Sequence, residues 1–454
     1  MPLAKFELML KTNDVYFFDS SEFEEIILHY TAIGKISLAK KALALGLKQH
    51  PQAISLKLVQ IDLLIQDQKI DLAQHLLERL EMIAPSNDQV FLQKAVILSQ
   101  KSKHKEAIES LKQALAITDD PNDVWSMIGM EYLFLEDYSR ALNSFIKCIE
   151  VEYDDYSSLY NVVYCFDMLE QHKEAIDYLE NYIEKDPYCE VAWHQLGLQY
   201  FYVKNFRKAL QAFDYAILID EYFIGAYLEK GKTLEELGEY KEAIKYYEKS
   251  ISIEDGSSFA YLRIGKCYEI IGNKKQALKY YNITVKEDPL LDKAWMALTD
   301  LYINDGNYEK ALYFINKALQ IDSENTLYWS RLGEINLKLN FFEEAVRAFR
   351  KCIALEDYSL DVFLALTDLL QFLGEFDDAI EVLLQAQGLY TDFAEIEFRL
   401  GALYITQHQM IQGLHFFEKG LKLNYEFHKI IKTLFPSIFN LKSVQLLVEK
   451  YKTQ

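Results

Sequence analysis

The 454-residue sequence has few of the residues that disulfide-linked or metal-binding proteins depend on. It contains 5 cysteines, an odd number, and none of them forms a CxxC pair: Cys148, Cys165, Cys189, Cys267 and Cys352. Such a set argues against a disulfide framework and fits a reducing compartment. No Cys/His group has zinc-ligand spacing, and no histidine pair has HExxH spacing. We expect buried free thiols, no metal site and a cytoplasmic location.

Motifs of catalysis and nucleotide binding are missing as well. The sequence has no GxSxG, no GxxxxGK[ST] and no GxGxxG after a strand. Acidic pairs such as Asp119–Asp120 and Asp377–Asp378 fall between helices or at helix starts. At those places carboxylates cap helices and favour the positive end of the helix dipole. We therefore expect no enzyme active site and no cofactor.

Long apolar runs and basic clusters are also absent. No apolar stretch approaches the roughly 20 residues of a membrane helix, so no transmembrane segment is expected. Lys5, Glu7 and Lys11 interrupt the N-terminal apolar residues, which argues against a secretory signal. The formal net charge is −21, and without a basic patch nucleic-acid binding is not expected. The acidity indicates solubility first and, as the alternative, a preference for basic or amphipathic partners.

What the chain does contain is a repeated pattern of helical stripes, clearest in Glu190–Phe223. Trp193 and Tyr200 lie seven residues apart, and Ala209 and Phe213 lie four apart after a polar break. Residues 3, 4 and 7 apart share one face of a helix. The stretch therefore predicts two amphipathic helices joined by a tight turn.

The pattern recurs every 34 residues. Steps of 34 from Ala209 reach a small residue each time, and we call these positions the markers: Ala39, Ala73, Ala107, Ala141, Ala175, Ala209, Ala243, Ala277, Ala311, Ala345, Ala379 and Gly413. All 4 tryptophans lie 16 residues before a marker, and glycines recur 12 before, aromatic residues 9 before and prolines 12 after. Self-similarity at one period predicts a repeat array in which the two helices cross closely at the marker.

This pattern resembles the tetratricopeptide repeat, W-x2-L-G-x2-Y followed by A-x3-F and P. The resemblance, which is to all-repeat arrays of the bacterial type without a catalytic domain, implies an all-α, right-handed superhelical α-solenoid. About twelve helix hairpins are expected over residues 20–427, between an N-terminal cap segment (1–19) and C-terminal capping helices (428–454) that break at Pro436. The repeats start at residues 20, 54, 88, 122, 156, 190, 224, 258, 292, 326, 360 and 394.

Two details are expected at the N-terminal end. Ser20 or Ser21 with Glu24 has the spacing of a capping box that opens the first helix. Apolar side chains ahead of it are expected to cover the open end of the first helix pair: Phe6, Leu8, Leu10, Tyr16, Phe17 and Phe18.

The resemblance also implies a binding surface, because the first helix of each pair lines the concave face of such arrays. In repeats four to six the groove positions are aromatic or apolar: Met130, Phe134, Tyr160, Tyr164, His194, Leu198, Phe201 and Tyr202. We expect them to bind a peptide with apolar anchors. The alternative is that they pack against each other across adjacent repeats. Arg263, Arg331 and Arg399 lack the lysine and asparagine partners of the carboxylate clamp that grips chaperone tails, so that mode is not expected.

The predicted function is a non-catalytic protein–protein interaction scaffold or adaptor that holds a partner peptide or subunit in its concave groove. One alternative is a self-associating structural subunit, either a homo-oligomer or part of a larger assembly. A second is a regulatory sensor that changes its pitch when a peptide binds.

Overall fold

The computed structural model describes residues 2–12, 16–253 and 257–452. Parts of the expected N-terminal cap, seventh repeat and C-terminal cap therefore lie outside the described residues. Within the described ranges every regular element is a helix. The predicted all-α repeat fold is confirmed.

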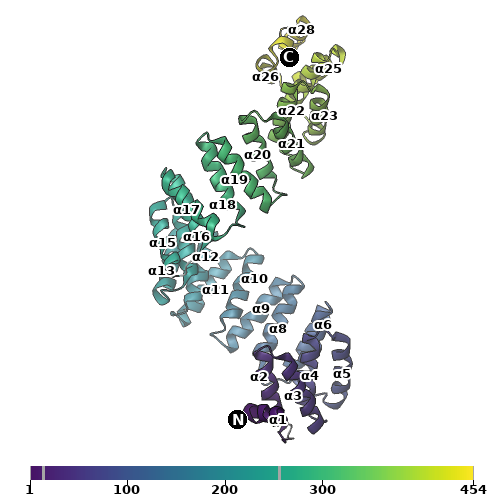
Figure 1. Ribbon diagram of the computed structural model, residues 1–454, viewed down its shortest axis with the longest axis vertical. Coiled ribbons are helices and arrows are strands. Elements are labelled where there is room, and N and C mark those ends of the chain that lie inside the picture. The colour runs from purple at the N-terminus through teal and green to yellow at the C-terminus, as the bar shows by residue number, and fades with distance from the viewer. Residues whose placement is uncertain (1, 13–15, 254–256, 453–454) are drawn as a thin grey trace. The chain divides into compact units, whose positions relative to one another are not determined.

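The chain divides into two compact units, residues 1–229 and 230–454, and each is described by itself. The first unit contains α1 (Pro2–Thr12), α2 (Ser20–Ala32), α3 (Ile36–Gln49), α4 (Ile54–Gln66), α5 (Ile70–Ile83), α6 (Asp88–Gln100), α7 (His104–Leu115), α8 (Pro121–Phe134), α9 (Tyr138–Val151), α10 (Tyr156–Met168), α11 (His172–Lys185), α12 (Glu190–Tyr202) and α13 (Phe206–Ile219). From α2 onward these helices form successive pairs, in which a first helix packs against the second helix that follows it (Figure 1). The boundary between the units falls inside α14 (Ile224–Glu236).

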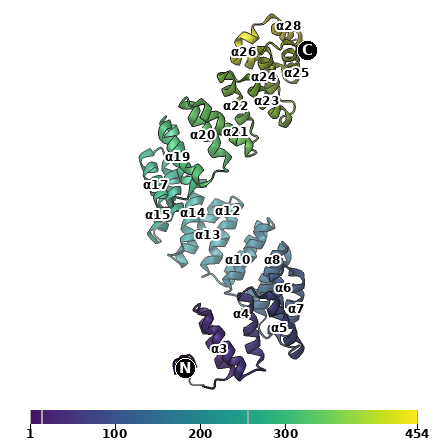
Figure 2. The same cartoon turned by 45° about the vertical axis from the view of Figure 1, so that its right-hand side comes forward.

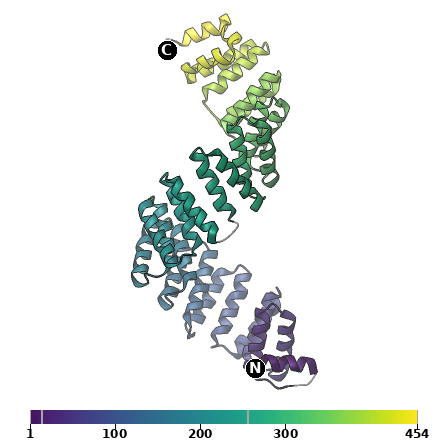
Figure 3. The same cartoon turned by 60° about the vertical axis from the view of Figure 1, so that its left-hand side comes forward.

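The second unit continues the same arrangement. Its helices are α15 (Tyr240–Ile253), α16 (Ser258–Ile270), α17 (Lys274–Glu287), α18 (Asp292–Asn304), α19 (Tyr308–Ile321), α20 (Thr326–Lys338), α21 (Phe342–Ala354), α22 (Leu360–Leu373), α23 (Phe376–Leu389), α24 (Ala394–Thr406), α25 (Met410–Leu423), η1 (Tyr425–Phe427), α26 (His428–Leu434), α27 (Pro436–Phe439) and α28 (Lys442–Tyr451). Figure 2 shows the pairs from α16 to α25 in order, and Figure 3 shows the short helices that follow α25 at the C-terminal end.

The markers lie where the two helices of each pair cross. Every marker alanine from Ala39 to Ala379 is completely buried, and Gly413 is buried as well. At the last crossing a Cβ on Gly413 would lie 2.4 Å from Ile405 and 2.7 Å from the carbonyl oxygen of Gly401. The predicted close crossing is therefore present along both units.

A glycine on the first helix admits an aromatic ring from the second helix in half of the repeats. A Cβ added to any of these glycines would lie only 2.4–2.6 Å from that ring. The pairs are Gly129–Phe145, Gly197–Phe213, Gly231–Tyr247, Gly265–Tyr281, Gly333–Phe349 and Gly401–Phe417. The other repeats have Leu or Ile in place of the ring and a larger residue in place of glycine: Ile27–Leu43, Ile61–Leu77, Ala95–Leu111, Val163–Leu179, Thr299–Ile315 and Thr367–Leu383. The two positions therefore fill one shared volume, as close-packed cores require.

The turn inside each hairpin uses a residue with positive φ, five residues before the marker. Five of these residues are glycines: Gly34, Gly238, Gly272, Gly306 and Gly374. The remaining repeats place other residues in the same left-handed conformation: Gln68, Ser102, Glu136, Glu170, Lys204, Asn340 and His408. Positive φ is uncommon for residues with a side chain, so the hairpin geometry imposes this conformation on the turn.

The N-terminal end differs from prediction in two details. Helix α2 is capped by Asp19, whose N–H donates to Glu22 at 3.0 Å, so the prediction of Ser20 or Ser21 with Glu24 is wrong. The helix begins at Ser20, which places both serines inside its first turn. Phe6 and Phe18 are fully buried, whereas three other side chains of the predicted cover are exposed: Leu8, Leu10 and Phe17.

All the cysteines are buried and free, as the sequence predicts. Burial raises the pKa of Cys165, Cys267 and Cys352 to about 12. Such thiols remain protonated at neutral pH and behave as small apolar side chains.

Candidate peptide-binding surface

The candidate groove residues lie on three first helices of the first unit: α8, α10 and α12. Candidates on the same helix recur four residues apart, as in Met130 and Phe134 on α8 or Tyr160 and Tyr164 on α10. Side chains at that spacing project from one face of a helix. Helices α10 and α12 contact each other directly, as α2, α4 and α6 do, so consecutive first helices lie side by side.

The eight candidates divide into two groups by exposure. Five are exposed, with 40–58% of their surface accessible, and we call them the aromatic surface: Met130, Phe134, Tyr160, Tyr164 and Tyr202. The other three are partly buried: His194, Leu198 and Phe201. The His194 ring meets Phe223 edge-on at 5.0 Å, and Phe201 packs against Phe206 at 5.5 Å. The structure therefore gives His194 and Phe201 packing contacts within the unit and leaves the first group open to solvent.

Two rings of the aromatic surface stack on histidines of the preceding repeat. Phe134 stacks on His104 with ring centroids 5.0 Å apart, and Tyr202 stacks on His172 at 5.2 Å. Each histidine is the first residue of a second helix and lies 30 residues before its aromatic partner. Tyr164 makes a looser edge contact with Tyr138, the first residue of α9, at 6.4 Å. Packing across repeats and exposure to solvent therefore occur in the same residues.

Hydrogen bonds hold both histidines in place. His104 Nδ1 lies 2.8 Å from the carboxylate of Glu131, which is itself buried, and His172 Nδ1 lies 3.0 Å from the amide oxygen of Gln199. Gln199 in turn donates to Asp167 at 2.8 Å. Because the histidines are fixed, the rings stacked on them lose little further freedom when a partner binds. Sequence reasoning missed these histidines, although the spacing of 30 residues before an aromatic residue was a usable signal.

The phenols of the surface are neutral at physiological pH. Burial raises the pKa of Tyr160, and a hydrogen bond with Gln195 partly opposes that shift. Burial and then the negative charge of Asp167 raise the pKa of Tyr202. The surface thus offers rings with hydroxyl groups beside carboxylates, which suits apolar anchors flanked by positive charge.

Arginines on first helices of the second unit are already paired. Arg263 donates two hydrogen bonds to Glu235, at 2.9 and 2.8 Å, and Arg331 lies 3.5 Å from Asp300. Arg399 pairs with Asp368 and, at 2.9 Å, with Glu395. Each of these three arginines has a carboxylate partner on the preceding repeat. They therefore act within the array, between neighbouring repeats.

The described residues include no group of three or more His, Cys, Asp or Glu side chains that could hold a metal ion. In the same part of the chain, no helix has the length and apolar character needed to cross a membrane.

Comparison with known proteins identifies the repeat. Two family models, both described as tetratricopeptide repeat, match residues 88–121, 224–256 and 327–357, and residues 126–188 and 271–326. Among curated proteins, 136 residues are 24% identical to anaphase-promoting complex subunit 3 of Schizosaccharomyces pombe. That match covers 30% of this chain but only 20% of the relative's length.

Solved structures give further likenesses. MamA is 26% identical with a TM-score of 0.33, over 36% of this chain and 95% of its own. The Cut9–Hcn1 hetero-tetramer of the APC/C provides a chain that is 14% identical with a TM-score of 0.39, over 88% of this chain and 92% of its own. A tetratricopeptide repeat protein from Parabacteroides merdae is 17% identical with a TM-score of 0.41, over 55% and 98%.

Proposed function

Because the chain belongs to the tetratricopeptide repeat family, we propose that it is a non-catalytic scaffold whose aromatic surface binds a peptide segment of a partner protein. The observation that carries the proposal is the run of exposed rings across α8, α10 and α12, fixed by stacking on the preceding repeat. Exposed aromatic side chains supply most of the binding energy in many interfaces.

The chemistry of the partner follows from the surroundings of the rings. Glu131 and Asp167 lie beside Phe134 and Tyr202 through their histidine partners, and the whole chain carries a formal charge of −21. The partner segment therefore has apolar anchors at helical or extended spacing and basic residues between them. The curated relative is, by its name, a subunit of a complex, which supports an assembly role.

The test is quantitative affinity capture from native extract with a variant that carries Tyr160→Ala, Tyr164→Ala and Tyr202→Ala. A matched control carries Tyr188→Ala and Tyr222→Ala, which remove rings that are 79% and 68% exposed in loops of the same unit. We expect the control to retain the partner and the groove variant to lose at least tenfold, since each hot-spot ring contributes about 1–2 kcal/mol or more.

Equal recovery by all three proteins overturns the aromatic surface as the binding site. Light scattering on the same proteins addresses the alternative of self-association. A concentration-dependent dimer that the groove variant alone fails to form would replace the partner peptide with a second copy of this chain.

A further inference from the structure

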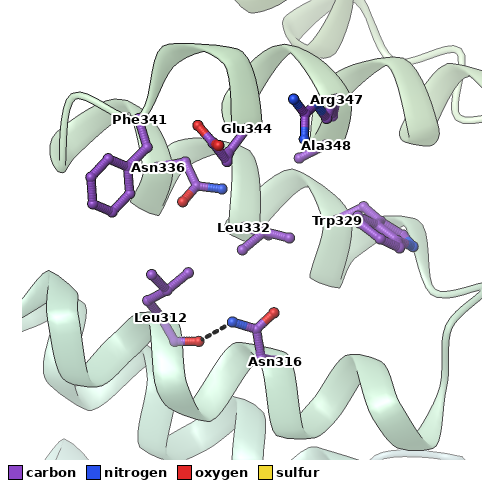
Figure 4. Close-up of a pocket in the computed structure, with 9 residues that line it drawn as sticks. All are labelled: Leu312, Asn316, Trp329, Leu332, Asn336, Phe341, Glu344, Arg347 and Ala348. Atoms are coloured by element: carbon purple, nitrogen blue, oxygen red, sulfur yellow. Dashed lines mark hydrogen bonds between the residues drawn. The ribbon is translucent and has the colours of Figure 1, made fainter.

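The second unit contains a cavity of about 490 Å³ between α19, α20 and α21. Figure 4 shows α19 facing α20 across this space, with Phe341 at one end and Trp329 at the other. Leu332 and Ala348 are buried and form its floor together with Asn336, whereas Phe341 and Glu344 are exposed at its mouth.

The cavity exists because this repeat lacks a ring that other repeats supply. Nine residues before the marker, the other repeats have Tyr, Phe or Leu, and this repeat has Asn336. Three residues after the marker, several repeats add a second ring, as in Tyr302 stacked on Phe314 at 5.3 Å, and this repeat has Ala348. No other repeat lacks a large apolar residue at both positions.

The sixth repeat shows what normally fills this place. Its small residue is Ala212, and Tyr200 lies in the space beside it. The Tyr200 hydroxyl donates to Glu180 and accepts from Lys208 Nζ at 3.0 Å. The fold thus accommodates a phenol ring at this point between a second helix and the next hairpin.

Asn336 makes the empty position polar at its base. Its residue is only 3% exposed, yet no hydrogen bond joins its side chain to another residue in the described part of the chain. A buried amide without a partner is costly, and it favours a ligand that offers both a donor and an acceptor. A hydroxyl group offers both, and an asparagine side chain both donates and accepts.

We propose that this cavity binds the phenol ring of a tyrosine side chain from a partner polypeptide. The ring enters from solvent, so its hydroxyl points inward to Asn336, the reverse of the internal Tyr200. Leu312, Leu332 and Ala348 contact the faces of the ring, and Trp329 borders its edge. The volume is within the range of ligand sites and has room for residues next to the tyrosine.

A polypeptide rather than a free phenol fits the mouth of the cavity. The amide nitrogen of Asn316 donates to the carbonyl oxygen of Leu312 at 2.8 Å, which leaves its amide oxygen as an acceptor facing α20 (Figure 4). Together with Arg347 it offers an acceptor and a donor at the rim, the groups that a peptide backbone requires. This site lies in the second unit and is independent of the aromatic surface on α8, α10 and α12.

The experiment measures ligand binding by NMR with four probes: p-cresol, toluene, and the blocked tripeptides Gly-Tyr-Gly and Gly-Phe-Gly. We expect p-cresol to bind about five- to tenfold more tightly than toluene, because toluene leaves Asn336 without a partner. The tyrosine peptide is expected to bind at least as tightly as p-cresol and to exceed the phenylalanine peptide by a similar factor.

Two variants localise the site. Asn336→Tyr recreates the Tyr200–Ala212 combination, so it is expected to fold with an unchanged or higher melting temperature and to abolish p-cresol binding. Lys338→Tyr adds the same ring at an exposed position of α20 and is expected to bind p-cresol like the wild type. Undiminished p-cresol binding by Asn336→Tyr overturns the site. Equal binding of toluene overturns the role of Asn336, and failure of the tyrosine peptide alone overturns the polypeptide source.

Discussion

Gly197 and Phe213 show how a single absent methyl group sets the distance between two helices. The phenyl ring occupies the place of a side chain on α12, since a Cβ there would lie 2.4 Å from it. The burial of a full aromatic ring at this crossing contributes more apolar contact than the glycine gives up. The pair is therefore one packing unit shared by two helices.

We expect Gly197→Ala to destabilise the protein by about 1–3 kcal/mol, the usual cost of overfilling a core. Phe213 lies fully buried and has no room to withdraw. The measurement is the urea midpoint of unfolding followed by circular dichroism.

Gly388→Ala is the matched control. Gly388 also lies within a helix, α23, but a Cβ there meets nothing within 4 Å, so alanine is expected to be neutral or stabilising by about 0.5–1 kcal/mol. Adding Phe213→Leu to Gly197→Ala reproduces the Ala95–Leu111 pair and is expected to recover part of the loss. A double variant less stable than the sum of the single changes contradicts the shared-volume explanation.

At this scale the sequence predicts more of the core than of the surface. The marker alanines are identical in role in every repeat, so periodicity alone locates them. The exposure of Phe134 and the partial burial of Phe201 depend on what the neighbouring repeat presents, His104 in one case and Phe206 in the other. Asn336 was visible as the polar residue in an aromatic column, but its effect required knowing that Ala348 lies opposite.

Helix starts vary from repeat to repeat although the helices do not. The residue before the second helix caps it through its side chain at Asn205, Asn273 and Asn307, which accept from backbone N–H groups at 3.2–3.4 Å. At Gln171 the same position has no side-chain cap, although its backbone angles (φ −96°, ψ 54°) resemble those of Asn205 (φ −88°, ψ 66°). The site at Gln171 is therefore already shaped for an asparagine.

We expect Gln171→Asn to stabilise the protein by about 0.5–1 kcal/mol by capping α11. Thermal unfolding and hydrogen exchange of the first turn of α11 measure the effect. The converse change, Asn205→Gln, is expected to lower stability by a similar amount. If both variants match the wild type, the caps contribute nothing to these hairpins.

Periodicity predicts where the helices run, and it does not predict how each hairpin turns. The positive-φ position carries glycine in repeats such as those of Gly272 and Gly306, but Glu170 and Lys204 adopt the same conformation elsewhere. Their strain of about 1–2 kcal/mol is small beside the packing of a whole hairpin. The residue type at the turn is consequently a weak signal, and the same holds for the cap at Asp19.

At the scale of the molecule, each repeat is stabilised by its neighbours and by little else. The N-terminal hairpin of the first unit has only one repeat beside it, and α1 covers its other side. Phe6 is fully buried there, with its ring 6.0 Å from Phe18 and 6.1 Å from Tyr30. The packing of α1 therefore replaces the missing repeat.

We expect Phe6→Ala to accelerate hydrogen exchange in α2 and α3 and to leave α10 and α12 unchanged, because the disturbance reaches only neighbouring repeats. The loss at the site is about 3–5 kcal/mol for a buried phenylalanine. Phe17→Ala, which removes a ring that is 62% exposed, is the control and is expected to change neither region. Faster exchange throughout the first unit contradicts nearest-neighbour stabilisation.

The two kinds of glycine–ring position also limit how such a gene can be shuffled. Recombination that joins the α12 sequence to the second helix of another repeat would place Gly197 opposite a leucine such as Leu179 and leave a void. The reciprocal product would press Phe213 against Val163. Crossovers between hairpins avoid both defects, so duplication and exchange in this chain are tolerated in whole hairpins and selected against within them.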